Sequence, residues 1–106
     1  MVFIELTPFI SFRIEHWTDE DLRALQNHLL VNPDAGDVLR GSSGLRKLRW
    51  ASSGRGKRGG ARVIYYRYVS AERIYLIYGY VKNEQEDLTS DQVKLLSELM
   101  KDIKHG

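Results

Sequence analysis

Lysine and arginine residues in the middle of the sequence are the side chains best suited to chemistry on a polyanion. Residues 38–71 contain nine basic and no acidic residues, whereas the stretches before and after each contain seven acidic residues. Such a concentration of positive charge attracts nucleic acid, the commonest intracellular polyanion. Cations can also stabilise the negative charge that develops when a phosphodiester is cleaved. We therefore expect a nucleic-acid-binding surface here, and the composition alone leaves binding and catalysis both open.

Three cations in this stretch are predicted to share one face of a β-sheet. Side chains alternate along a strand, so Lys47 and Arg49 project to one face and their apolar neighbours to the other. Arg62 begins the next strand-like run, where it can join the same face, and Lys82 ends a third run. With no carboxylate expected among them, these like charges repel one another and lower stability. A polyanionic ligand best explains the cluster.

The glycine-rich segment SSGRGKRGGAR, residues 52–62, is predicted to contain a mobile basic loop between two strands. It lacks the G-x-x-x-x-G-K-[ST] pattern of a nucleotide-binding P-loop, and a strand rather than a helix follows it. Its cations suit phosphate groups, and tyrosines in the neighbouring strands offer stacking surfaces for unpaired bases. The candidate RNA-binding residues are Arg46, Arg55, Lys57, Arg58, Tyr66 and Tyr80.

Other kinds of site find little support in the sequence. There is no cysteine, and the three histidines, His16, His28 and His105, are scattered without the spacing of a metal-ligand set. We therefore expect no metal and no cofactor, so any catalysis would have to use lysine and arginine. Neither a targeting segment nor an apolar run long enough for a bilayer is found. The expected location is the cytoplasm, with no membrane partner.

The hydrophobic pattern predicts a single α+β domain over residues 1–106. Short apolar runs rich in β-branched and aromatic residues indicate strands, and a period near 3.6 indicates helices. In chain order the predicted elements are a strand at 1–6, helices at 7–17 and 18–31, strands at 45–52, 61–69 and 73–81, and a helix at 88–106. This β-α-α-β-β-β-α order predicts an antiparallel sheet with the helices packed on one face or edge. The last three strands are expected to form an antiparallel meander.

Threonines mark the predicted start of each helix. Thr7 is expected to cap the first helix, because a proline follows it at the first helical position. Thr18 with Asp21, and Thr89 with Gln92, match the capping-box spacing in which a side chain three residues on returns to the cap. These spacings define the boundaries of the second and third helices.

Two motifs in this order resemble a known family. The segments GLRKLRWASSGRGKRGGARVIYYRY, residues 44–68, and YVKNEQEDLT, residues 80–89, resemble the RelE/HigB superfamily of bacterial toxins, most closely its HigB-like branch. The resemblance implies a RelE-like fold and the toxin of a type II toxin–antitoxin module. It also implies a ribosome-dependent mRNA endonuclease that cuts the codon in the ribosomal A site. The implied partners are a cognate antitoxin, expected to be a helix-turn-helix protein, the ribosome with its 16S rRNA, and mRNA.

The resemblance also implies roles for individual residues. Lys47 and Arg49 match the basic pair on the second strand, which is implicated in activating the 2′-hydroxyl and holding phosphate. Arg62 matches the arginine after the glycine turn, expected to stabilise transition-state charge. Lys82 takes the place where the RelE branch has an arginine proposed as general acid. The resemblance therefore implies a metal-independent endoribonuclease with these four residues as its catalytic set.

One position departs from the family pattern. Leu88 stands where the RelE branch often has a catalytic tyrosine, so the resemblance does not assign the general acid and base, and Asn83 and Glu84 are the nearby alternatives. A non-catalytic RNA-binding module and a degenerate, inactive toxin are the alternative functions. Both share the basic surface of the nuclease, so charge does not separate the three.

Overall fold

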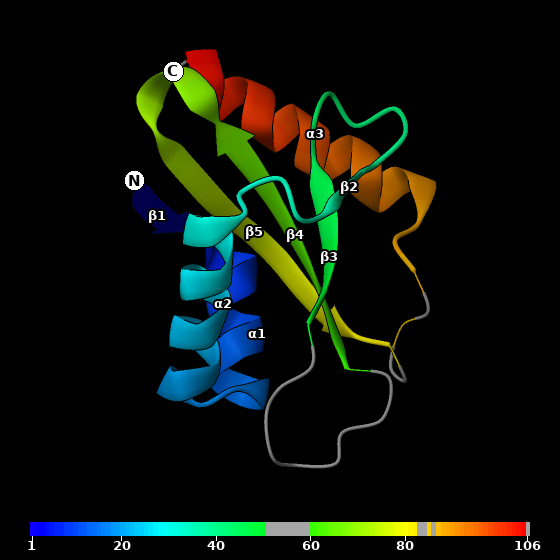
Figure 1. The fold of residues 1–106 in the computed structure, drawn as a ribbon. Helices are drawn as coiled ribbons and strands as arrows, with labels where there is room; N and C mark the ends of the chain where they lie inside the picture. Colours follow the sequence, from blue (N-terminus) through cyan, green and yellow to red (C-terminus); the bar gives the residue numbers. More distant parts are fainter. Residues whose placement is uncertain (51–59, 83–84, 86, 106) are drawn as a thin grey trace.

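A five-stranded sheet with three α-helices forms the fold (Figure 1). The computed structural model describes residues 1–50, 60–82, 85 and 87–105. The elements are β1 (Val2–Glu5), α1 (Thr7–His16), α2 (Asp19–Val31), β2 (Asp37–Val38), β3 (Arg46–Trp50), β4 (Ala61–Tyr68), a 3₁₀ turn (Val69–Ala71), β5 (Arg73–Val81) and α3 (Ser90–His105). The α+β class and the order of the predicted elements are confirmed. The structure adds β2, which is too short for an alternating pattern to predict it.

The strand order in the sheet is β1-β5-β4-β3-β2. The predicted meander is confirmed, because β3, β4 and β5 pair antiparallel in sequence order. The first strand differs from the prediction, since β1 pairs parallel with β5, from Val2 opposite Arg73 to Glu5 opposite Leu76. The two helices that follow β1 separate it from the meander, so it joins the sheet at the free edge of β5. The sheet is therefore mixed.

The helices cover both faces of the sheet, whereas the sequence predicted them on one face or edge. Phe9 of α1 and Leu25 of α2 pack on one face, and Leu96 and Met100 of α3 pack on the other. The reason is the composition of β4 and β5, because both strands carry apolar side chains on each of the two faces of the sheet. The strand residues buried on the α1/α2 face include Val63, Tyr65, Ile74 and Leu76, and those on the α3 face include Ile64, Tyr75, Ile77 and Tyr80. A sheet buried on both faces needs a cover on each.

Two of the three predicted helix caps are confirmed. Thr18 and Asp21 form a reciprocal capping box at α2, and the Gln92 N–H donates to the Thr89 hydroxyl oxygen at 3.1 Å while Gln92 Oε1 accepts from the Thr89 N–H. Thr7 is not a cap: the extended residue is Leu6, whose N–H donates to the Leu76 carbonyl at 2.9 Å. Pairing with β5 thus runs to Leu6 and the helix begins directly after it. No helix in the described ranges is long and apolar enough to cross a membrane.

A buried tyrosine anchors the loop that precedes β2. The Tyr65 hydroxyl donates to the Pro33 carbonyl and accepts from the Gly36 N–H, both at 2.9 Å. Gly36 lies so close to β3 that a Cβ atom would be 2.9 Å from the Lys47 carbonyl oxygen. The loop is therefore held against the strand that carries the central cations.

Candidate active site

The four cations named as catalytic candidates lie around one pocket of about 410 Å³. Lys47 and Arg49 come from β3, Arg62 from β4, and Lys82 from the residue after β5. The remaining lining residues are Ala35, Asp37 and Leu48. The structure thus brings together residues from three strands, and their catalytic role stays a prediction. Ala35 of the Tyr65-anchored loop and Asp37 of β2 were not foreseen as part of the wall.

Strand register explains this convergence. Arg49 lies directly opposite Arg62, and Arg62 lies opposite Tyr80 on β5. Residues opposite one another in an antiparallel pair project to the same face, so these three side chains form a row across the sheet. The Lys82 N–H donates to the Gly60 carbonyl at 3.3 Å, which joins the end of β5 to the start of β4. Main-chain pairing of β3, β4 and β5 therefore positions the cations of the pocket.

Arg62 is the least accessible of the four cations. It is 7% exposed, whereas Arg49 and Lys82 are exposed and Lys47 is half-buried. One guanidinium nitrogen of Arg62, Nη1, donates to the Ala61 carbonyl at 3.4 Å. Arginine stays protonated at any physiological pH and presents a planar fork that matches phosphate oxygens. Burial holds that fork at one place in the pocket.

Asp87, in the segment before α3, contacts the site and was missed by the sequence analysis. Its Oδ1 accepts from Lys47 Nζ and from the Tyr80 hydroxyl, each at 3.2 Å, and from the Leu88 N–H at 2.8 Å. The Leu88 hydrogen bond and then Lys47 hold the pKa of the Asp87 carboxyl below its usual value. The expectation that no carboxylate neutralises the cluster is therefore wrong for Lys47. Forty positions of sequence separate the pair, and the pattern of the basic stretch holds no signal for Asp87.

Tyr80 is a buried hydrogen-bond donor rather than a stacking platform. Its side chain is on the α3 face and the residue is 5% exposed, so its ring offers no open face to a base. Burial and the negative charge of Asp87 raise the pKa of Tyr80 to about 12. The hydroxyl therefore remains protonated at neutral pH and donates to Asp87. Tyr66 is half-buried and packs 6.4 Å from Tyr68 between ring centroids, away from the residues that line the pocket.

Arg46, another RNA-binding candidate, lies on the opposite face of β3 from Lys47. Its Nη1 donates to the Gly36 carbonyl at 2.7 Å, and its Nη2 lies 3.6 Å from Asp34 Oδ1. Arg46 thus fastens the loop before β2 and does not reach the pocket. The candidates Arg55, Lys57 and Arg58, and the alternatives Asn83 and Glu84, lie outside the described residues.

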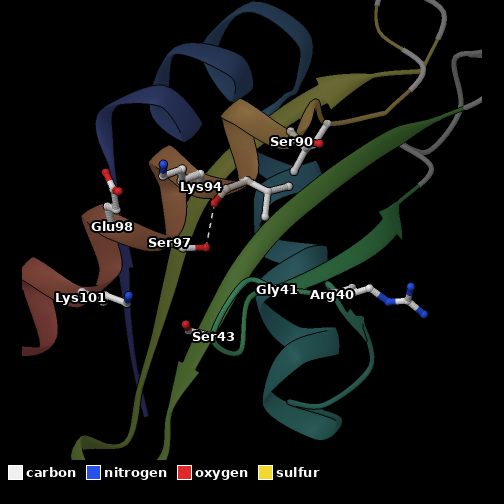
Figure 2. Close-up of a pocket in the computed structure, with 10 residues that line it drawn as sticks. Arg40, Gly41, Ser43, Ser90, Lys94, Ser97, Glu98 and Lys101 are labelled. Carbon is white, nitrogen blue, oxygen red and sulfur yellow. Dashed lines mark hydrogen bonds between the residues drawn. The ribbon is translucent and has the colours of Figure 1, made fainter.

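A second, larger pocket of about 490 Å³ lies between α3 and the turn at residues 40–44 (Figure 2). Lys94 and Lys101 on α3 flank Glu98, and the Arg40 side chain points away from the helix. Its charges are therefore mixed, and none of the four candidate catalytic cations lines it. In the part of the chain that the structure describes, no three histidine, cysteine or acidic residues are grouped to hold a metal ion. The basic pocket on the sheet is the better candidate for phosphate chemistry.

Comparison with known proteins supplies the family. The family described as the RelE toxin of the RelE/RelB toxin–antitoxin system matches residues 15–105. The chain belongs to the RelE toxin family. A toxin of a toxin–antitoxin system has an antitoxin as its partner, so membership in the RelE family makes this chain a toxin with an antitoxin partner. The finer assignment to the HigB-like branch stays a prediction.

A solved structure supports the RelE-like fold independently. The chain matches a mutant of the E. coli toxin RelE in the free state with a TM-score of 0.60 and 18% sequence identity. The match covers 89% of this chain and 95% of that chain. At this identity the likeness concerns the fold. The RelE-like architecture predicted from the sequence is therefore confirmed.

Proposed function

We propose that this RelE-family toxin is a ribosome-dependent mRNA endonuclease that cuts the codon in the A site. The observation that carries the proposal is the pocket in which Lys47, Arg49, Arg62 and Lys82 meet. Four cations around one concave site suit a phosphodiester, because cleavage concentrates negative charge on the phosphate oxygens. The proposed reaction is metal-independent, and inhibition of translation is its result.

In the proposed reaction the 2′-hydroxyl, activated by Lys47 and Arg49, releases its proton to solvent water as the 2′-oxygen attacks the adjacent phosphorus. The bond from that oxygen to phosphorus forms, the bond to the 5′-oxygen breaks, and the products are a 2′,3′-cyclic phosphate and a 5′-hydroxyl. Lys47 and Arg49 hold the phosphate, and Arg62 stabilises the charge of the transition state. Lys82 delivers a proton to the departing 5′-oxygen. Arg62 suits its role because its guanidinium is already fixed, so little reorganisation accompanies the reaction.

Dependence on the ribosome has a physical reason. The pocket offers phosphate-binding cations, but a flexible mRNA strand must still be held with its 2′-oxygen in line with the leaving oxygen. Holding a substrate in the reactive geometry can supply much of a rate enhancement. We propose that the ribosome supplies this positioning in the cytoplasm, with contacts to 16S rRNA and mRNA. The antitoxin, proposed to be a helix-turn-helix protein, blocks the activity.

The proposal is tested with purified toxin and ribosomes programmed with a defined mRNA. Primer extension is expected to place new 5′ ends inside the A-site codon, and the same mRNA without ribosomes is expected to stay intact. Stable ribosome binding with intact mRNA would contradict the nuclease and favour a non-catalytic RNA-binding protein.

A further inference from the structure

Asp87 connects two elements of the candidate site through one carboxylate oxygen. Its Oδ1 accepts from Lys47 Nζ on β3 and from the Tyr80 hydroxyl on β5, each at 3.2 Å. Tyr80 in turn lies opposite Arg62 in the β4–β5 register. We infer that Asp87 is a positioning residue of the active site, which holds the Lys47 ammonium group in place beside Arg62. The inference rests on the proposed nuclease function.

Helix capping does not account for Asp87. The start of α3 has its own reciprocal pair, in which Thr89 and Gln92 each satisfy the main-chain N–H of the other. Asp87 adds one bond to the Leu88 N–H, but its side chain is 63% exposed and contributes little to a core. An exposed carboxylate that accepts from two side chains of the site is better explained by what it does to those side chains.

The main chain at Asp87 is fixed from its other side. Gln85 Nε2 donates to the Asp87 carbonyl at 3.0 Å and to Gln92 Oε1 at 2.8 Å. Gln85 Oε1 accepts from the Tyr78 hydroxyl at 3.2 Å. Thus β5 and α3 brace the segment from which the carboxylate projects. A carboxylate on a fixed main chain can restrict the lysine that donates to it, whereas a carboxylate on a mobile main chain would move together with the lysine.

The two side chains that donate to Asp87 differ in mobility, because Lys47 is flexible and Tyr80 is rigid. Lysine carries its charge on a flexible four-carbon stem, so an unrestrained Lys47 would spend much of its time away from a bound phosphate. Tyr80 is rigid, because its ring is buried in the sheet face. With a pKa of about 12, its hydroxyl stays protonated and donates to Asp87 throughout the neutral range. Asp87 therefore transfers the fixed position of Tyr80 to Lys47.

The experiment compares Asp87→Asn with Asp91→Asn. Both variants lose one negative charge near the start of α3, but Asp91 is an exposed residue in the first turn of that helix and does not line the pocket. Single-turnover cleavage on programmed ribosomes is measured against toxin concentration. We expect Asp87→Asn to lower the maximal rate about 10- to 100-fold, as misplacement of a reacting group does, with a half-saturating concentration close to that of the wild type. Asp91→Asn is expected to cleave at the wild-type rate, and Asp87→Glu to recover part of the loss.

A second readout follows Tyr80 directly. In protein labelled with ¹³C at the tyrosine ζ position, the Tyr80 signal, assigned with Tyr80→Phe, is titrated at alkaline pH. Because the Asp87 charge raises the Tyr80 pKa, Asp87→Asn is expected to lower it and Asp91→Asn to leave it unchanged. A folded Asp87→Asn variant that cleaves as fast as Asp91→Asn would overturn the inference, as would an unchanged Tyr80 titration. A wild-type protein that cleaves nothing would instead refute the proposed function, and the titration would still test the Asp87 contact.

Discussion

Replacement of Arg62 by glutamine tests whether the charge of this residue serves cleavage or the stability of the fold. Glutamine keeps part of the buried stem and a hydrogen-bonding end but removes the charge and the fork. Arg67→Gln is the matched control, because Arg67 lies on the same strand and points to the opposite face, where it donates to Asp34 at 3.0 Å. The two variants remove the same charge from β4 on its two sides.

The expected losses differ by orders of magnitude. Arg62 is 7% exposed and lines the pocket, so its charge would act on the reacting phosphate with little screening. Removal of one preorganised group of this kind costs about 10²- to 10³-fold in rate, or ~3 to 4 kcal/mol of transition-state stabilisation. Arg67 forms an exposed pair whose loss costs ~0.2 to 1 kcal/mol of unfolding free energy, and we expect no loss of cleavage rate.

The assay is single-turnover cleavage of A-site mRNA at saturating ribosome concentration, with urea unfolding of each variant in parallel. Arg62→Gln is expected to unfold within about 1 kcal/mol of the wild type, because the retained part of the side chain still fills the site. The reasoning is refuted if a folded Arg62→Gln protein cleaves within a few-fold of Arg67→Gln. Equal losses in both variants would show that total charge, rather than position in the pocket, governs the activity.

Three further predictions concern stability. Tyr65→Phe removes both hydrogen bonds of the buried hydroxyl and leaves the buried Gly36 N–H without its acceptor, so urea unfolding should show a loss of about 2 kcal/mol, whereas Tyr68→Phe on the same strand should lose much less. Gly79→Ala would place a Cβ atom in overlap with the Phe12 ring, so the ring or the helix that carries it must shift, and the unfolding free energy should fall by ~1 to 3 kcal/mol. An unchanged midpoint would contradict this packing. The pKa of Tyr80 is raised from 10.0 to about 12, so between these pH values the folded state holds a proton that the unfolded state releases. The contribution of Tyr80 to the unfolding free energy is therefore complete below pH 10 and declines toward pH 12. Tyr80→Phe should weaken that alkaline decline when unfolding is measured against pH.

Strand alternation accounts for the part of the site that the sequence could predict. Lys47 and Arg49 share a face because two residues is the period of a strand, and Arg62 joins them because β3 and β4 pair antiparallel with Arg49 opposite Arg62. The same rule placed Arg46 on the opposite face from Lys47. Its basic character suggested RNA binding, which stays a prediction, and no pattern in the sequence indicated the hydrogen bond by which it holds the loop at Gly36.

The features that the sequence could not predict depend on contacts between distant segments. Asp87 reaches Lys47 only after β5 and the start of α3 are in place, and no local pattern encodes that approach. The burial of Tyr80 depends on which face of the sheet its side chain takes and on what packs there, which an alternating run cannot specify when both of its sides are apolar. The parallel pairing of β1 with β5 could not be predicted either, because the direction and the partner of an edge strand are set only when the sheet is assembled.

The position of β1 has a consequence for the time at which the molecule matures during synthesis. Val2 pairs with Arg73, so the strand that leaves the ribosome before the other elements must wait until most of the chain has been made. Contacts between segments so far apart in sequence form slowly, because a long loop must close before they form. The cations meet on β3, β4 and β5, and those strands pair with their neighbours in chain order. The strands that carry the basic pocket are therefore joined by pairings much closer in sequence than the pairing that adds β1 to the sheet.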